Sequence, residues 1–310
     1  MHLIALLIGL AIERLATQLF HWRRMRWLDR IIDAGFRQVR RLGNWPALIP
    51  VFLLTLLLAL PVFAVMYFLG DTLQGFSYLI LAVVVLLVSI GPKDIGEEVR
   101  DYCKALESED EELIQSTAKA IIEDDVPDDA RERIASVEAA VCVQANNRLF
   151  AVVFWFVVLG AVSGSIGPLA AWIYRVTDLI RRRAVFSAAR DEDTDGHLAR
   201  IRDAAEMLHG WLAWVPARLT AVGYAAAGHF DEAIAALRAP TEERDDTTSE
   251  HSEHLLARVG VAALALQDSP GESITERGIR GALAANKLVF RLLLLWAVVI
   301  AAMTLYGLTR

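Results

Sequence analysis

The stretch that decides the fold is NNRLFAVVFWFVVLGAVSGSIGPLAAWIYRVTD, which runs from Asn146 to Asp178. It is long enough to cross a bilayer, yet its middle, Gly160–Pro168, is rich in glycine and ends in proline. Glycine costs a helix about 1 kcal/mol relative to alanine, and proline costs about 3 kcal/mol. The pattern predicts two apolar half-helices, Leu149–Ala161 and Leu169–Thr177, around a break. The alternative is a single spanning helix kinked by Gly and Pro, which are common in such helices.

A break at membrane depth has structural consequences. Irregular backbone survives there only where other protein buries it or where it lines a wet cavity. We therefore expect a packed membrane bundle with a polar site near the break. The basic cluster Arg181–Arg183 follows the break, and the positive-inside rule favours a re-entrant hairpin that keeps both flanks cytoplasmic. The apolar length also permits a full crossing.

Composition indicates an integral membrane protein. Hydrophobic residues make up 55% of the 310 residues, above the roughly 45–50% of a soluble domain, and they occur in blocks. Membrane spans are predicted over Ala47–Leu69 and Phe76–Ile90, which carry no charge, and over Lys287–Leu308, which has Lys287 and Arg291 at its start. With the broken segment they predict an all-α helical bundle with about four membrane segments and helical soluble regions.

Charge and cysteine usage exclude several classes of protein. The net charge is −7, which argues against nucleic acid as a partner. The two cysteines, Cys103 and Cys142, have no metal-type spacing. Nucleotide-binding, zinc-protease and hydrolase motifs are missing from the sequence. We expect no cofactor, no metal site and no catalytic residue of these types.

The order of segments predicts a multi-pass membrane protein. Within the soluble parts, Ser108 is predicted to cap a helix, residues 239–253 are predicted to form a loop, and Leu255–Gln267 is predicted to be a short helix. The predicted regions are 1–45, amphipathic and basic; 46–92, a transmembrane hairpin; 93–145, acidic and helical; 146–180, the broken membrane segment; 181–286, helical with a WVPARLT motif; and 287–310, the C-terminal transmembrane helix.

Polar groups inside apolar stretches are the candidate site residues. Arg218 lies in the apolar run Trp211–Ala227, where an unpaired charge is costly. Its planar guanidinium suits a carboxylate or a phosphate. We hypothesise that it pairs with Asp178, with Glu13 or with an anionic ligand. Asn147 is a further polar group at the start of the broken segment.

A family resemblance rests on these same residues. Trp214–Thr220, read as WVPARLT, resembles the (I/V)PARLTA signature of the CobD/CbiB family of cobalamin-biosynthesis membrane synthases. The likeness extends to Phe154-Trp155, Tyr174 and Thr177-Asp178. Within that superfamily the sequence looks more like the AmpE family, whose likeness covers nearly the whole chain. Its further features are the Glu13-Arg14-Leu15 start, Gly228-His229 and the closing pattern from Ala284 to Gly307.

Departures from the synthases favour the AmpE-like interpretation. The later acids that the synthases carry before the apolar segment are absent in Glu138–Asn147, and their acid pair before the PARLTA signature corresponds to His209-Gly210. A ligase that uses nucleotide and Mg²⁺ needs carboxylates to hold the metal. The resemblance therefore implies a scaffold that has no catalytic residues. The candidate ligand-binding residues are Arg218, Asp178, Asn147, Glu13, Thr220 and Trp155.

What the resemblance implies is an inner-membrane regulatory or sensory protein linked to β-lactamase induction, antibiotic resistance and cell-wall stress. Expected partners are the lipid bilayer, a small anionic ligand or a partner membrane protein, and a second copy in a homo-oligomer. The alternative is a synthase of the adenosylcobinamide-phosphate type. A transporter subunit is a third hypothesis, because broken helices often form binding sites at the bilayer midplane.

Overall fold

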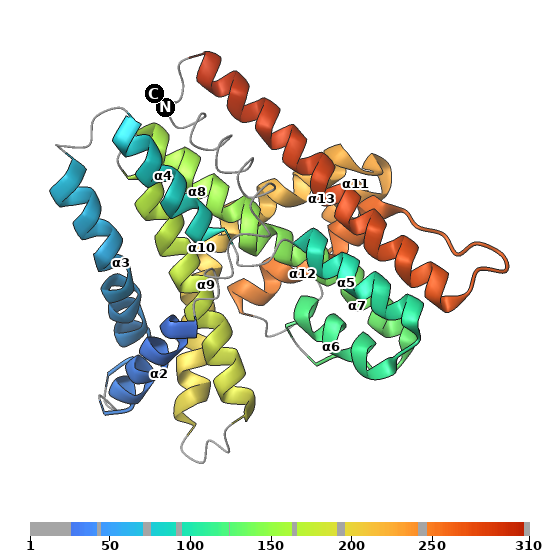
Figure 1. Ribbon diagram of the computed structural model, residues 1–310, viewed down its shortest axis with the longest axis horizontal. Helices are drawn as coiled ribbons and strands as arrows, with labels where there is room; N and C mark the ends of the chain where they lie inside the picture. The colour runs from blue at the N-terminus through green and yellow to red at the C-terminus, as the bar shows by residue number, and fades with distance from the viewer. Residues whose placement is uncertain are drawn as a thin grey trace.

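A computed structural model describes residues 26–41, 45–70, 76–90, 95–123, 125–162, 166–190, 196–240 and 247–306. Every regular element in these ranges is a helix, which confirms the predicted all-α class (Figure 1). The elements are α2 (Arg26–Arg41), α3 (Leu48–Gly70), α4 (Phe76–Ser89), α5 (Ile95–Ser108), α6 (Glu111–Ile121), α7 (Ala130–Ala145), the π-helical turn η2 (Asn146–Phe150), α8 (Ala151–Val162), α9 (Gly167–Arg190), α10 (His197–Ala227), α11 (Phe230–Arg238), α12 (Thr248–Leu264) and α13 (Ile274–Leu305).

Three of the described helices are long and apolar enough to cross a membrane. They are Leu48–Phe68, the continuous rod Ala130–Val162 and Ile274–Leu305, whereas Leu79–Ser89 in α4 is apolar but shorter. Exposed leucine and phenylalanine side chains line α3, as expected for a helix that faces lipid. The prediction of a membrane protein is confirmed. The last helix begins at Ile274 rather than at Lys287, because Ser273 and Glu276 form a capping box there.

The broken segment folds back on itself. α8 ends at Val162, and Gly167-Pro168 begin α9, where proline is tolerated because the first turn needs no N–H donor. Gly167 packs against Gly160, and Arg182 bonds Gln144, so the two helices are antiparallel. A Cβ on Gly167 would lie 2.6 Å from the Phe156 carbonyl oxygen, which explains why glycine stands at this crossing. The alternative of one kinked helix is wrong, and the returning helix extends to Arg190 instead of ending at Thr177.

Two local predictions in the polar part of the chain are corrected. Asp110, not Ser108, caps α6, because Glu109 adopts a left-handed φ of 55° and ends α5 one turn before. The predicted loop over residues 239–253 ends earlier, since α12 begins at Thr248. A capping box between Thr247 and Glu250 starts this helix.

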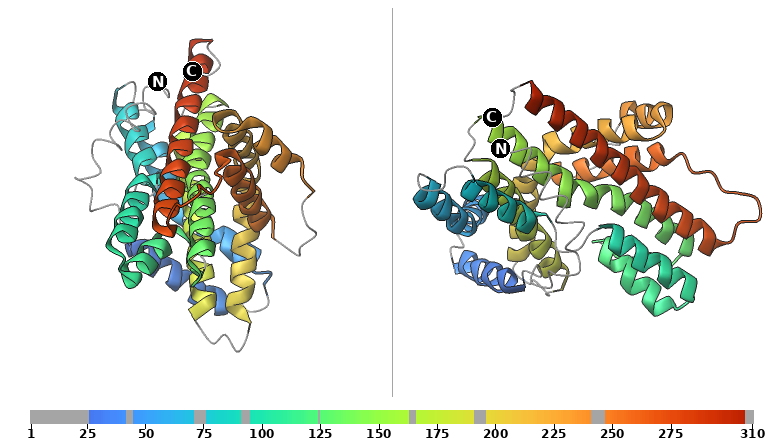
Figure 2. Two further views of the ribbon diagram at one scale, coloured as in Figure 1. Left: turned by 90° about the vertical axis from the view of Figure 1, so that its right-hand side faces the viewer. Right: turned by 45° about the horizontal axis from the view of Figure 1, so that its top comes forward.

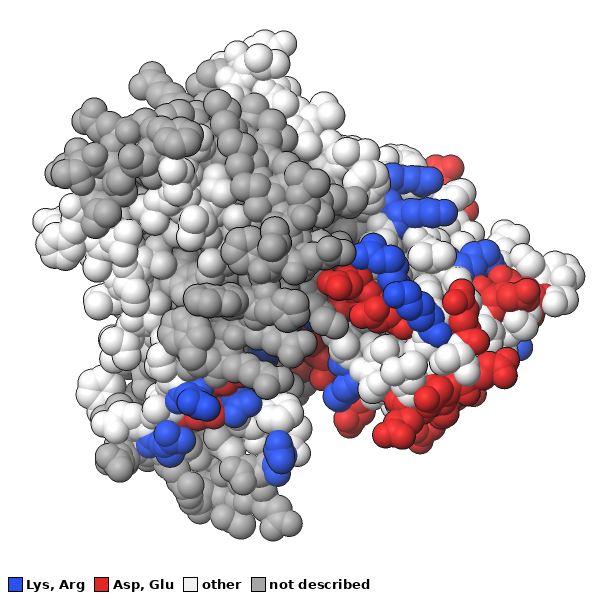
Figure 3. Space-filling model, viewed as in Figure 1, with Lys and Arg blue, Asp and Glu red and all other residues white. Residues whose placement is uncertain are grey.

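Charged and uncharged side chains occupy different parts of the molecular surface. Charged side chains gather over α5, α6 and the first half of α13, and a second group lies over α2 (Figure 3). The surface near α3 and the end of α13 is largely uncharged. α13 runs alongside α7 and α8 and in the same direction, since Gly278 contacts Ile134 and Trp296 contacts Phe150 (Figure 2). This helix therefore passes from the polar side into the apolar side.

Two prolines in the interior of described helices are each met by an indole from a neighbouring helix. Pro216 in α10 has no N–H for the Leu212 carbonyl, and Trp155 of α8 donates its indole N–H to that oxygen at 3.1 Å. Pro61 lies inside α3, where Trp172 of α9 donates to the Leu58 carbonyl at 3.0 Å. Trp155 thus replaces the donor that Pro216 lacks, whereas Trp172 donates to the carbonyl next to that of Leu57, which Pro61 leaves without a donor.

This arrangement predicts a coupling between Trp155 and Pro216. We expect Trp155→Phe to lower the free energy of unfolding by about 1–3 kcal/mol, because it leaves the Leu212 carbonyl without a donor. In a Pro216→Ala background the same change should cost much less, because the introduced alanine restores the backbone N–H. Equilibrium unfolding of the four proteins of this double-mutant cycle in mixed micelles measures the coupling. Additive effects would mean that the indole stabilises α10 through packing alone.

Candidate functional site

A buried carboxylate organises the centre of the molecule. Asp178 in α9 has no exposure to solvent, and three arginines of its own helix surround it. Arg175 and Arg182 approach its Oδ2 at 2.8 Å and 2.9 Å, and Arg181 approaches Oδ1 at 3.3 Å. Side chains three and four residues apart share a face of an α-helix, so α9 itself brings these groups together.

Carboxylates from other elements complete this arrangement. Glu123, after α6, bonds Arg181 at 3.0 Å and Arg182 at 2.7 Å, while Glu253 of α12 lies 3.3 Å from Arg181. Arg148 and Glu98 pair at 2.7 Å, and Gln144 accepts from both Arg148 and Arg182 at 2.9 Å. We call this set the Asp178 cluster, which contains as many arginines as carboxylates: Glu98, Glu123, Gln144, Arg148, Arg175, Asp178, Arg181, Arg182 and Glu253.

The π-helical turn connects the cluster to α10. Asn147 donates to Glu253 at 3.0 Å, Asn146 donates to Asn147 at 3.0 Å, and Thr220 donates to Asn146 at 3.0 Å. The side chains of Asn146, Asn147 and Thr220 are buried. π-Turns inside α-helices frequently mark functional sites. Here the turn directs two adjacent amides toward the charged groups.

His209 of α10 lies against the cluster and has the partners of a catalytic triad in a different order. Its Nδ1 is 2.8 Å from the Ser249 hydroxyl, and its Nε2 is 3.3 Å from the Tyr174 hydroxyl and 3.8 Å from Asp178. Burial, with a further contribution from Arg181, lowers the pKa of His209 to about 3. A general base for a serine nucleophile works best with a pKa near the operating pH. The neutral, fully buried ring therefore fits a hydrogen-bonding role between α9 and α12 better than it fits nucleophilic catalysis.

The predicted site residues lie in three places. Asp178, Asn147 and Thr220 belong to one hydrogen-bonded network. Trp155 supports the proline turn of α10. Glu13 lies outside the described residues. Within the described ranges, no group of three or more His, Cys, Asp or Glu side chains is placed to hold a metal ion.

Arg218 is separate from this network, and its proposed pairing with Asp178 is wrong. Its guanidinium lies 4.0 Å from the centre of the Trp214 ring and donates to the Trp214 carbonyl at 3.1 Å. Around it, α10 exposes Trp211, Val215 and Leu219, which form an apolar surface. The cation–π contact and the Trp214 carbonyl satisfy this arginine, which forms no ion pair with the buried carboxylates in the described part of the chain.

Several members of the cluster escaped the sequence analysis. Arg181 and Arg182 were interpreted as a topological signal, although their spacing from Asp178, like that of Arg175, matches a helical face. Glu253 fell in a predicted loop, although the T-x-x-E pattern of Thr247–Glu250 indicates a helix start before it. Glu123 and His209 carry no local signal, because only the tertiary fold brings them to Asp178.

Comparisons with known proteins agree with this architecture. Residues 1–309 match the family described as regulatory signalling modulator protein AmpE. The chain belongs to the AmpE family. This membership confirms the resemblance, and it makes the chain a member of a regulatory family with helices suited to a membrane.

The chain also has a more distant similarity to a protein described with cobalamin biosynthesis. A protein described as cobalamin biosynthesis protein CobD, from Stutzerimonas stutzeri (strain A1501), is 28% identical over 189 residues. The alignment covers 61% of this chain and 54% of that protein, so the chain spans about half the length of this curated relative. No solved structure matches the chain.

The buried charges predict a large effect of neutralising Asp178. We expect Asp178→Asn to lower the free energy of unfolding by about 3–5 kcal/mol, because it leaves buried guanidinium groups without their shared counter-ion. The control is Asp231→Asn, which removes a charge on exposed α11 and should change stability by less than about 0.5 kcal/mol. Denaturant unfolding in mixed micelles measures both. Equal effects of the two changes would contradict the arrangement described for the Asp178 cluster.

Glu206 predicts a pH dependence of stability. Burial, and then the charge of Glu250, raises the pKa of this α10 carboxyl to about 7. Its protonated form stabilises the fold at low pH, and this contribution is lost as the pH rises from about 4.5 through 7. We therefore expect Glu206→Gln to unfold with a free energy about 1–3 kcal/mol higher than wild type at pH 8, and with little difference at pH 4.

Thermal unfolding at several pH values measures this difference. Glu232→Gln, at an exposed position of α11, is the control for loss of one carboxylate. A Glu206→Gln advantage that is the same at pH 4 and pH 8 would show that the charge of Glu206 is not its source.

Proposed function

We propose that this chain is a non-catalytic sensor in the bacterial inner membrane that modulates β-lactamase induction in response to cell-wall stress. The family description, regulatory signalling modulator, supports a regulatory role. The observation that carries the mechanism is the Asp178 cluster. It joins the returning helix α9 to the polar side of the molecule through Glu123 and Glu253, and it includes the Arg148–Glu98 pair between the π-helical turn and α5.

A buried charge network suits signal transmission for a physical reason. Its ion pairs are strong only while every partner is in place, because an unpaired buried charge costs several kcal/mol. A displacement of α12 or of the α6–α7 connection would therefore change the energy of α9 directly. The cluster therefore couples the binding of a ligand or partner at the polar side to the arrangement of the membrane helices, and the coupling acts in both directions.

The candidate ligand-binding residues take different roles in this proposal. Asp178, Asn147 and Thr220 transmit the signal as parts of the buried network. Arg218 and Trp155 act near the apolar surface, where the Arg218 guanidinium meets lipid headgroups or a partner membrane protein. Glu13 is proposed as a ligand or partner contact on the family resemblance alone.

The test is induction of β-lactamase in a strain that lacks its own family member. We expect the wild-type chain to change the amount of nitrocefin hydrolysis after a β-lactam challenge, and Glu253→Gln to weaken that change. Glu253 is chosen because it lies at the edge of the cluster and keeps its shape as Gln. Asp231→Asn, which alters an exposed carboxylate by the same charge, should behave as wild type.

Immunoblots of the membrane fraction control for the amount of each variant. If Glu253→Gln and Asp178→Asn both insert correctly and both give normal induction, the Asp178 cluster does not transmit the signal. The similarity to a CobD protein supports one other function, a membrane synthase of cobalamin biosynthesis. Restored cobalamin-dependent growth of a strain without that synthase, together with unchanged induction, would favour this second function.

A further inference from the structure

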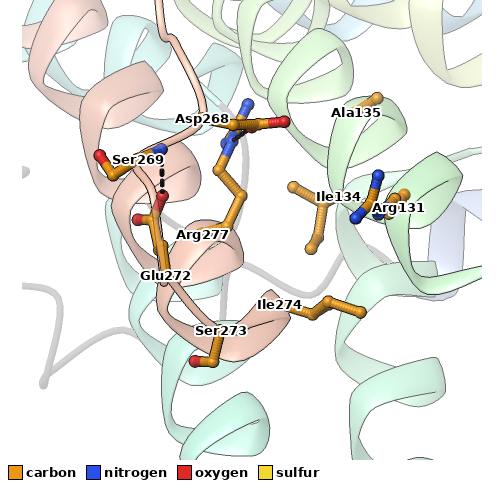
Figure 4. A pocket seen from close by; sticks show the side chains of 9 residues that line it. All are labelled: Arg131, Ile134, Ala135, Asp268, Ser269, Glu272, Ser273, Ile274 and Arg277. Carbon is orange, nitrogen blue, oxygen red and sulfur yellow. Dashed lines mark hydrogen bonds and ion pairs between the residues drawn. The ribbon is translucent and has the colours of Figure 1, made fainter.

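An open cavity lies on the polar side of the molecule, away from the Asp178 cluster. It has a volume of about 340 Å³, within the roughly 300–1,000 Å³ of small-molecule sites. One wall is the first turn of α7, with Arg131 and Ile134. The other is the connection from α12 to α13, with Asp268 and Ile274 (Figure 4).

Some of the charged groups in this cavity hold its walls together. Arg277 bonds Glu138 of α7 and also Asp268 Oδ1 at 3.1 Å, so it joins the two sides. Glu272 receives two hydrogen bonds of 2.6 Å from Arg280. These side chains are already committed to partners and give the cavity a fixed shape.

Two charged groups remain available to a ligand. Arg131 is exposed, and its guanidinium makes no hydrogen bond or ion pair with another residue in the described part of the chain. Asp268 is 81% exposed and uses Oδ1 for Arg277, which leaves Oδ2 open. The apolar side chains of Ile134, Ala135 and Ile274 line the space with them (Figure 4).

The charges select against simple ions. A small anion near Arg131 would face the carboxylate of Asp268 across the cavity, and a small cation near Asp268 would meet Arg277 (Figure 4). A ligand that carries both charges on an apolar body satisfies both groups.

We propose that this cavity binds a small zwitterion, an amino acid or short peptide with free ends. Its carboxylate meets Arg131, its ammonium meets Asp268, and its side chains contact Ile134 and Ile274. If the chain has the proposed regulatory function, on which this step rests, this cavity is the site where the ligand that controls it binds. It touches the first turns of α7, which leads into the π-helical turn, and of α13, which leads into a membrane span.

The first experiment measures binding to the purified full-length protein in lipid nanodiscs. The probe is L-alanyl-L-alanine, compared by calorimetric titration with its N-acetylated, C-amidated and doubly blocked forms. We expect saturable binding of the zwitterion, and binding weaker by about tenfold or more for each blocked form. Equal binding of the doubly blocked form, or no saturable binding of the dipeptide, would overturn the proposal.

Matched variants place the binding in this cavity. Arg131→Gln and Asp268→Asn should each weaken dipeptide binding by about tenfold or more. Arg238→Gln and Asp231→Asn, which remove the same charges from exposed α11, should bind as wild type. A normal melting temperature of each variant shows that its fold is intact. Undiminished binding by both Arg131→Gln and Asp268→Asn would exclude this site.

A second readout separates this inference from the proposed function. Arg131→Gln is tested in the β-lactamase induction strain, and loss of the response supports the cavity as the input. Dipeptide binding with an unaffected response in Arg131→Gln would overturn the regulatory role of the cavity but leave the proposed function standing. If the wild-type chain does not change induction at all, the proposed function fails, while the binding result still decides the site.

Discussion

A carboxylate that is removed from water is the constraint on which this fold depends. Burying an ion costs several kcal/mol, and a fold tolerates it only with near-complete pairing. Asp178 meets this condition through Arg175, Arg181 and Arg182, which α9 places on one face. Arg181 and Arg182 also pair with acids outside α9, Glu253 in α12 and Glu123 in the α6–α7 connection. Because the buried charges must balance, α12 and the α6–α7 connection are held against α9.

The backbone imposes a parallel requirement inside the apolar part. Proline in α3 and α10 weakens hydrogen bonding in a region where water is scarce, and a lone carbonyl there is costly. The indoles of Trp172 and Trp155 supply donors from the two arms of the α8–α9 hairpin. Glycines at positions 160 and 167 let those arms approach closely. The hairpin is therefore fixed by small residues at its tip and by polar bonds along its sides.

The sequence allowed the class of fold and the break to be predicted, because both depend on local composition. Apolar blocks without charge indicate membrane helices, and Gly160–Pro168 cannot form a good helix. Helix starts were harder, since Asp110 and Thr247 cap helices in stretches that look uniformly polar. The side chains of Asp110 and Thr247 accept hydrogen bonds from the first turns of their helices. Asp and Thr are favoured N-cap residues, so a search for N-caps would select both positions.

The site was only partly predictable. Asp178 and Asn147 stood out because a polar group in an apolar stretch needs a partner. The predicted partner of Arg218 was wrong, because its contact lies on its own helix: Trp214, four residues earlier, shares its face and stacks on it. Glu123 and Glu253 meet Arg181 from positions that are distant in the chain. Such contacts arise from tertiary packing, which local patterns do not encode.

The π-helical turn between α7 and α8 carries a mechanical consequence. It holds one residue more than an α-helical turn, with the Ala151 amide bonded to the Asn146 carbonyl. Removing that extra residue from the turn would rotate α8 about its axis by roughly 100° and shift it by about 1.5 Å relative to α7. Asn146, Asn147 and Arg148 are bonded to neighbouring elements and oppose this screw motion. These side-chain hydrogen bonds therefore fix the rotation of α8 relative to α7 about their common axis.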